Sequence, residues 1–130
     1  MTGVNPCTGT TCAGGTSVIR VYPPTTAGGF DYTAISQEFR ALSSTTYSLG
    51  FFYRCLNAAA TSGIDVYYNG QRLGGVTCPT VASAQFRQAS DLTFTTDATG
   101  VGQIEVRFLN PTLSTALYFY ADAFRASAIS

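Results

Sequence analysis

The sequence predicts an all-β fold, an antiparallel two-sheet β-sandwich of about eight strands wired as a jelly roll. Apolar and polar residues alternate with a period of two, most clearly in residues 47–55, where every odd position is apolar. Turn and breaker residues separate eight such runs, and a set of strands with no helix between them favours a sandwich or a barrel. With 130 residues, 45% of them hydrophobic, the chain can build one domain with its own core.

The boundaries of the strands come from the alternation and from the breakers between the runs. Pro23-Pro24 ends the first strand, and Asn110-Pro111 separates the last two. Asn69-Gly70 offers the turn of a two-residue hairpin. In chain order, the expected strands span residues 18–22, 30–39, 47–56, 64–69, 71–77, 91–96, 103–109 and 116–124.

Jelly-roll wiring places the first, eighth, third and sixth strands in one sheet and the second, seventh, fourth and fifth in the other. The four cysteines allow three full pairings. In this wiring the third strand ends at Cys55, and the hairpin returns Cys78 to the same end of the sandwich. We therefore predict a Cys55–Cys78 disulfide, which leaves Cys7 and Cys12 to close a short loop.

The Cys7–Cys12 loop suggests that the chain has two parts. We expect an N-terminal segment, residues 1–15, that contains the Cys7–Cys12 loop, and a single sandwich domain in residues 16–130.

The amino-acid composition excludes several classes of function and indicates the cellular compartment. The seven basic residues are all arginine and balance seven acidic ones, so the chain is a poor electrostatic partner for nucleic acid or anionic lipid. Without histidine it has no Ser-His or Cys-His relay and no imidazole metal site. No apolar run approaches the ~20 residues that a membrane span needs. The even number of cysteines and the 11% charged residues favour a secreted, extracellular protein over a cytosolic domain with four reduced thiols.

Three segments resemble a known family. They are residues 36–39 (Ser-Gln-Glu-Phe), 46–54 (Thr-Tyr-Ser-Leu-Gly-Phe-Phe-Tyr-Arg) and 116–124 (Ala-Leu-Tyr-Phe-Tyr-Ala-Asp-Ala-Phe). They resemble the core strands of jelly-roll carbohydrate-binding modules, above all the module-like domains of fungal secreted proteins. The resemblance covers roughly residues 16–125 and implies non-catalytic binding of carbohydrate.

Modules of this family often hold a structural calcium between a glutamate of the opening segment and an aspartate of the closing strand. Here Asn5-Pro6 runs directly into Cys7, and Asp122 is followed by Ala123 where the family usually carries paired aspartates. The resemblance leaves Asp122 as the candidate calcium ligand, and we expect the domain to need no cofactor.

Strand parity predicts which side chains face the core. Phe51, Ile104 and Val106 should be nearly fully buried, whereas Phe52 should not. On the sheet that contains the fourth and seventh strands, the candidate ligand-binding residues face outward: Asp65, Tyr67, Glu105 and Arg107, with Glu38 and Arg40 as further members. An aromatic ring flanked by planar hydrogen-bonding groups suits a saccharide. The alternative is a solvated face of cross-strand Glu–Arg pairs.

The opposite sheet presents Phe52, Arg54, Tyr118 and Tyr120 outward. Three rings on one outward face are unusual for a lone domain, so we expect a subunit contact or a covering loop there.

These residues predict a non-catalytic extracellular module that binds a neutral polysaccharide or cell-wall glycan. Tyr67 would stack on a sugar ring, and its charged neighbours would bond the hydroxyls. Catalysis by Glu38 and Glu105 is disfavoured, because no insertion forms a pocket around them and each has an arginine nearby.

The alternative function is a self-assembling structural or surface protein with the same fold. Zero net charge removes self-repulsion, and residues 1–15, which show no clear strand pattern, could add a strand to a neighbour.

Overall fold

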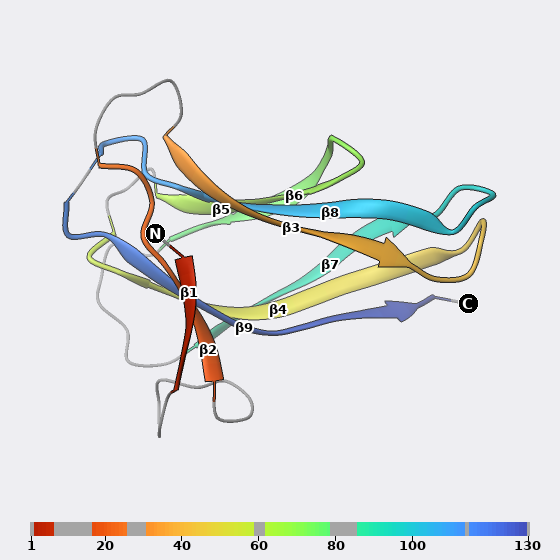
Figure 1. Cartoon of the computed structure of the whole chain (residues 1–130), viewed down its shortest axis with the longest axis horizontal. Coiled ribbons are helices and arrows are strands. Elements are labelled where there is room, and N and C mark those ends of the chain that lie inside the picture. Colours follow the sequence, from red (N-terminus) through yellow and green to blue (C-terminus); the bar gives the residue numbers. More distant parts are fainter. Residues whose placement is uncertain are drawn as a thin grey trace.

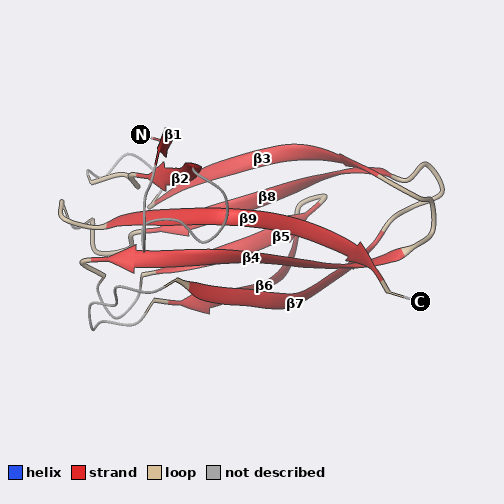
Figure 2. Cartoon of the chain, turned by 90° about the horizontal axis from the view of Figure 1, so that it is seen from below, coloured by secondary structure: helices blue, strands red, loops and turns tan. Residues whose placement is uncertain are grey.

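In the part of the chain that the structure describes, nine β-strands form two antiparallel sheets that pack face to face (Figures 1 and 2). The computed structural model describes residues 2–6, 17–25, 31–58, 62–78, 86–113 and 115–129. The strands are β1 (Thr2–Pro6), β2 (Ser17–Val21), β3 (Tyr32–Arg40), β4 (Thr46–Leu56), β5 (Gly63–Tyr68), β6 (Gln71–Thr77), β7 (Arg87–Thr95), β8 (Val101–Leu109) and β9 (Tyr118–Ala128). The five-stranded sheet has the order β1-β2-β9-β4-β7, and the four-stranded sheet has the order β3-β8-β5-β6. The predicted fold class and jelly-roll wiring are confirmed.

The structure adds one strand and lengthens two others. β1 pairs with β2 along its whole length, at the edge of the five-stranded sheet. Sequence pattern missed it because Gly3, Asn5 and Pro6 are poor strand formers. β7 begins four residues before the expected position and β9 ends four residues after it. Within the described ranges, no helix has the length and apolar character needed to cross a membrane.

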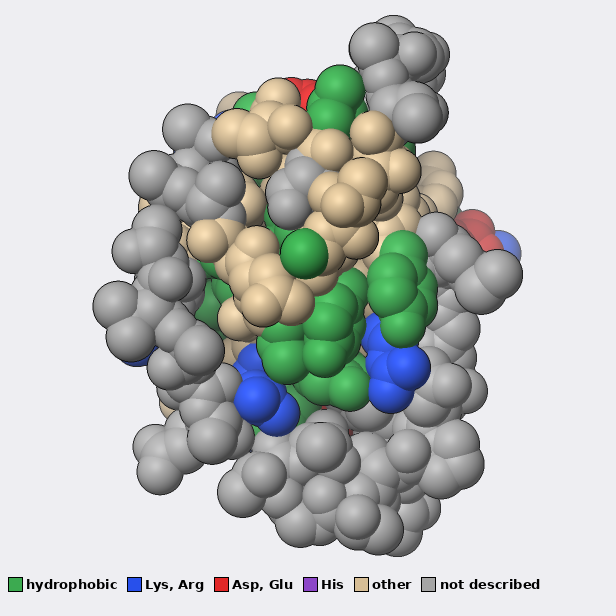
Figure 3. Space-filling view, turned by 90° about the vertical axis from the view of Figure 1, so that its left-hand side faces the viewer, with side chains coloured by type: hydrophobic (Ala, Val, Ile, Leu, Met, Phe, Trp, Pro, Cys, Tyr) green, Lys and Arg blue, Asp and Glu red, His purple; other side chains and the backbone are tan. Residues whose placement is uncertain are grey.

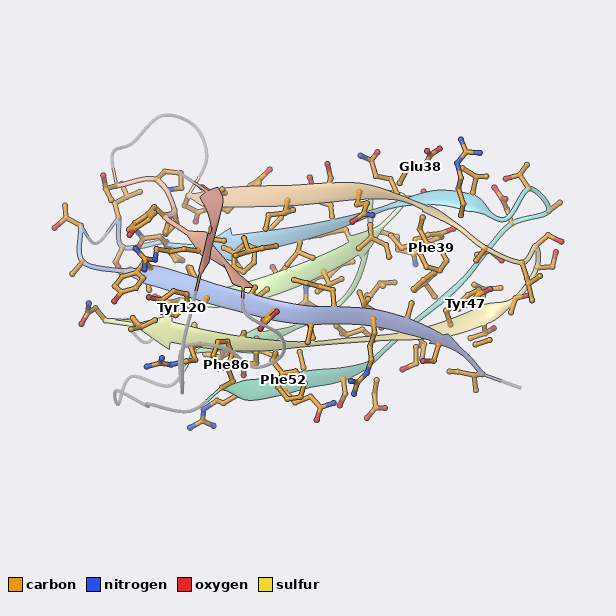
Figure 4. All side chains as sticks on the ribbon, turned by 60° about the horizontal axis from the view of Figure 1, so that its bottom comes forward. Glu38, Phe39, Tyr47, Phe52, Phe86 and Tyr120 are labelled. Atoms are coloured by element: carbon orange, nitrogen blue, oxygen red, sulfur yellow. A yellow bond between two sulfur atoms is a disulfide. The ribbon has the colours of Figure 1, made fainter. Side chains whose placement is uncertain are left out.

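The core lies between the sheets and follows the alternation of β4. Every second residue of that strand is buried, and Phe51 is only 1% exposed, while Phe52 is partly exposed. In Figure 4, Phe39 and Tyr47 approach each other from opposite sheets, and their ring centroids are 5.1 Å apart. Val106 is also buried. The predicted inward and outward faces of β4 are therefore confirmed.

Ile104 corrects the core prediction, because it is only partly buried. It points inward, but it lies beside an opening between β3 and β9. β2 pairs only with the Phe119–Ala121 part of β9 and does not extend along the rest of that strand. A cavity of about 220 Å³ at this opening is lined by Ile104 and Phe124.

The Cys55–Cys78 disulfide is present, as predicted, with a Cα–Cα distance of 5.9 Å. It joins the end of β4 to the end of β6 and so ties the two sheets together at one end. The Cys78 amide also donates a hydrogen bond to the Ser62 carbonyl, at 2.8 Å. The predicted Cys7–Cys12 pair lies outside the described residues.

Candidate functional site

The four predicted ligand-binding residues lie side by side on the outward face of the four-stranded sheet. β5 and β8 pair so that Asp65 is opposite Arg107 and Tyr67 is opposite Glu105. Residues that share a register position in neighbouring strands point to the same side of a sheet. We call this surface the ion-paired face: Tyr32, Asp65, Tyr67, Arg72, Glu105 and Arg107.

Two short ion pairs organise the charges of the ion-paired face. Arg107 Nε donates to Glu105 Oε1 at 2.7 Å, and both side chains are about 30% exposed (28% and 31%). Arg72 Nη2 donates to Asp65 Oδ1 at 3.0 Å. The hydrogen bond to Glu105 is the main reason that the pKa of Arg107 is raised above its ordinary value. Positive and negative groups therefore alternate across the face.

Arg107 also lies over two tyrosine rings. Its guanidinium carbon is 4.0 Å from the ring centroid of Tyr67 and 4.7 Å from that of Tyr32. These distances are within the range of cation–π contact, which holds a guanidinium in place without neutralising it. The result is a row of three planar groups, Tyr32, Arg107 and Tyr67, anchored by the Glu105 carboxylate.

Sequence reasoning missed Tyr32 and Arg72 as members of this face. Tyr32 shares the even parity of Glu38 on the second predicted strand, so parity alone could have found it. Arg72 lies opposite Tyr67 because the two-residue turn Asn69-Gly70 pairs Tyr68 with Gln71 and Tyr67 with Arg72. The predicted hairpin turn could therefore have found it.

Gly75 leaves room for the Arg72–Asp65 pair. It lies opposite Asp65 on β6. A Cβ atom added there would collide with the Asp65 Oδ1 atom and with the Ile64 carbonyl. Any larger residue would therefore disturb the carboxylate that Arg72 holds.

Glu38 and Arg40 do not join the network, although they lie on the same sheet. They bond each other along β3 at 3.2 Å, with side chains 55% and 72% exposed. Figure 4 shows Glu38 pointing away from the core. Each glutamate is thus bonded to the arginine two residues after it, which does not suit a catalytic acid–base pair.

Asp122, the candidate calcium ligand, has a local partner instead. Its Oδ1 accepts a hydrogen bond from the Ala123 amide at 2.8 Å, and Ala123 has a positive φ of 54°. The two residues lie at a β-bulge between β9 and β4, after which Phe124 stacks on Phe51 with centroids 4.8 Å apart. Among the described residues, no group of three or more metal-ligating side chains gathers around Asp122 or elsewhere.

The outward side of the five-stranded sheet carries a second polar–aromatic surface, the aromatic–arginine face: Arg20, Tyr22, Phe52, Arg54, Phe86, Tyr118 and Tyr120. Tyr120 is paired in register with Arg20 of β2 on one side and with Arg54 of β4 on the other. Their guanidinium carbons lie 5.3 Å and 5.8 Å from its ring centroid. Tyr120 is only 7% exposed, so this one of the three outward rings is already covered within the chain.

Tyrosine hydroxyls hold Arg20 in place. Arg20 donates to the hydroxyl of Tyr22 at 3.2 Å and to that of Tyr120 at 3.1 Å. These two bonds, that to Tyr22 first, raise the pKa of Arg20. Tyr22, which is 40% exposed, stacks on Tyr118 with an interplanar angle of 24°. Figure 3 shows hydrophobic side chains gathered between two basic ones at this end of the molecule.

The fold is similar to that of several solved carbohydrate-binding modules. One is TmCBM61, solved with β-1,4-galactotriose: it is 15% identical, the TM-score is 0.64, and the match covers 98% of this chain and 82% of that chain. A second is the family 6 module of the laminarinase LamC from Zobellia galactanivorans, 15% identical with a TM-score of 0.59 over 97% and 87% of the two chains. The xylan-binding CBM22-1 domain of Paenibacillus barcinonensis Xyn10C is 7% identical, with a TM-score of 0.60 over 98% and 83%.

No protein-family model and no curated protein sequence matches the chain. At these low identities the likeness to solved structures shows a shared jelly-roll fold, in agreement with the resemblance found in the sequence.

Proposed function

We propose that this chain is a non-catalytic carbohydrate-binding module that binds a neutral polysaccharide on its ion-paired face. The observation that carries the proposal is the row of Tyr32, Arg107 and Tyr67, flanked by Glu105 and Asp65. Flat aromatic groups contact the apolar faces of sugars, and rigidly held planar donors and acceptors bond their hydroxyls. The fold shared with solved carbohydrate-binding modules supports the same function.

The contacts within the face define how a sugar would lie. One face of Tyr67 is occupied by Arg107, so the sugar would lie across the row of three planar groups rather than flat on Tyr67 alone. A guanidinium has five N–H donors, and the Glu105 bond uses the one on Nε. The remaining donors, with the carboxylates of Glu105 and Asp65, would bond the sugar hydroxyls.

A neutral polysaccharide fits this face better than an acidic one. Each arginine of the face is neutralised by a carboxylate within 3.0 Å, so a polyanion would gain little long-range attraction. We expect a weak affinity, of about 10–100 µM or poorer, because few exposed contacts must offset the cost of ordering the ligand. Binding should change little with salt.

The natural setting would be extracellular, with a polysaccharide or cell-wall glycan as partner. The disulfide and the low content of charged residues support a secreted protein. The chain would divide into an N-terminal segment, residues 1–15, and a sandwich domain, residues 16–130. β1 of the N-terminal segment pairs with β2 in the five-stranded sheet.

Calorimetric titration of glucan, xylan, mannan and chitin oligosaccharides tests the proposal. One of them should bind, and Tyr67→Ala should reduce its affinity about tenfold or more. Tyr118→Ala, which removes a ring from the opposite sheet, is the matched control and should leave the affinity unchanged. Absence of heat with all four ligands, or equal effects of the two substitutions, would contradict the proposal.

Self-assembly is the competing function, and β1 bears on it because it pairs with β2 of its own chain rather than with a neighbour. Size-exclusion chromatography and electron microscopy of the titrated sample distinguish the two. Large regular particles together with an absence of glycan binding would favour the structural function.

A further inference from the structure

We infer that the free edge of β9, residues 124–128, pairs with the same edge of a second copy of the chain and forms a two-fold dimer. The dimer extends the five-stranded sheet across both copies. The inference rests on the direction of the backbone groups of β9, on the groove beside the strand and on the register that its charge allows. It does not depend on the proposed glycan site.

The first step is the edge itself. β9 pairs with β4 along its length, but β2 pairs only with the Phe119–Ala121 part of β9. Figure 2 shows β2 beside one end of β9, while the other end of β9 runs on past it. Within the described ranges, no strand pairs with residues 124–128 on the side away from β4. An unpaired strand edge is a template for another strand.

The second step is the direction of the backbone groups. The Ile129 amide donates a hydrogen bond to the Thr46 carbonyl, which lies at the start of β4, at 2.9 Å. Because the backbone groups of successive residues in an antiparallel strand point to opposite edges, those of Ser127 also face β4. The N–H and C=O groups of Ala126 and Ala128 face the free edge instead. A second strand can therefore bond both of these residues.

The third step is the groove beside the free edge. The cavity of about 220 Å³ between β3 and β9 is lined by apolar side chains of both sheets, among them Phe39, Leu49, Ile104 and Phe124. Phe124 is 38% exposed, although its ring stacks on Phe51. A strand added to β9 would place every second side chain over this cavity. Pairing would therefore bury apolar surface as well as form backbone bonds.

The fourth step is the register, which favours a second copy as the occupant. In a two-fold antiparallel pair, one residue lies opposite itself. Centring the pair on Arg125 would oppose two guanidiniums, and the backbone groups of that residue face β4 by the same alternation. Centring it on Ala126 uses the outward groups. Arg125 then lies opposite Ser127 of the other copy, whose hydroxyl can accept its N–H groups, and Phe124 lies opposite the small Ala128. The zero net charge of the chain adds no repulsion between copies.

The geometry of such a dimer bears on polysaccharide binding. The two-fold axis is perpendicular to the shared sheet, so both four-stranded sheets lie on the same side of it. On the proposed function, the two ion-paired faces would engage one polysaccharide together, and the avidity would exceed the affinity of a single face.

Sedimentation velocity of the whole chain over a range of concentrations tests the pairing. We expect a monomer–dimer equilibrium of micromolar affinity or weaker, because a short strand pair buries a small area. Ala126→Pro removes an N–H that faces the free edge and no bond to β4, so it should weaken dimerisation about tenfold or more. Tyr118→Ala, a control on the aromatic–arginine face, should leave the dimer unchanged.

Hydrogen exchange followed by NMR keeps the inference testable if the proline variant fails to fold. The amides of Ala126 and Ala128 should become more protected as concentration rises, whereas the Ser127 amide should be protected at every concentration. Ala128→Asp alters an exposed side chain, so the variant should fold, and its carboxylate opposite Phe124 of the other copy should disfavour the dimer.

Four results would overturn the inference. They are a monomer at every concentration, protection of Ala126 and Ala128 that does not change with concentration, a dimer that a folded Ala126→Pro variant retains, and particles larger than a dimer. A dimer that Tyr118→Ala dissociates would likewise overturn it, because the contact would then belong to the aromatic–arginine face.

Discussion

The two outward faces of the sandwich use the same components, tyrosine rings and guanidiniums, in different surroundings. On the ion-paired face, Arg107 and Arg72 each hold a carboxylate within 3.0 Å. On the aromatic–arginine face, Arg20 donates to tyrosine hydroxyls and Arg54 lies over rings. The carboxylates of the ion-paired face lie close to its arginines, because Glu105 is two residues from Arg107 on β8 and Asp65 lies on β5 beside Arg72 of β6. The neighbours of each arginine on its sheet therefore decide whether it bonds a carboxylate or a ring.

The comparison of the two outward faces depends on the alternation of β4, because this alternation places Phe51 in the core and Phe52 on the aromatic–arginine face. Phe51→Ala should destabilise the protein by about 3–5 kcal/mol, because it empties a well-packed site. Phe52→Ala should cost about 1 kcal/mol, since its ring is partly exposed. Denaturant unfolding of both variants measures this difference. A larger effect of Phe52→Ala in a monomer would mean that the two sides of β4 have been exchanged.

The Cys55–Cys78 disulfide joins the sheets that carry the two faces. Replacing both cysteines with alanine should lower the free energy of unfolding by about 3 kcal/mol, as expected for a sequence separation of 23 residues. The measurement is thermal or denaturant unfolding, with non-reducing peptide mapping to verify the bond in the unaltered protein. A Cys12–Cys55 link in that map would contradict the relative placement of the sheets.

The smallest effect tests how the surroundings of an ion pair on the four-stranded sheet change its strength. A double-mutant cycle on Glu105 and Arg107 should give a coupling of about 1 kcal/mol, the upper end for partly exposed pairs, and the coupling should shrink in high salt. The more exposed Glu38–Arg40 pair is the control, and its coupling should be about 0.3 kcal/mol or less. If the two couplings proved equal, the rings around Arg107 would not strengthen its ion pair.

The sequence determined every described strand except β1, the jelly-roll order and the side of the sheet on which most residues lie. Period-two alternation is a local property, so it located Phe51 inside and Tyr67 outside before any tertiary contact was known. The jelly-roll wiring, with the hairpin return at Asn69-Gly70, was enough to predict the Cys55–Cys78 bond. Parity placed Asp65, Tyr67, Glu105 and Arg107 on one outward face.

Only the tertiary structure decided the positions at which the pairing of strands departs from the local sequence pattern. The bulge at Asp122 and Ala123 turns Phe124 onto Phe51, and the bulge between β5 and β6 places Gly75 rather than Gly74 opposite Asp65. β1 is a strand because β2 offers it a free edge, not because its own residues favour one. A bulge or an edge pairing depends on which strand lies alongside, and the residues within the segment do not contain that information.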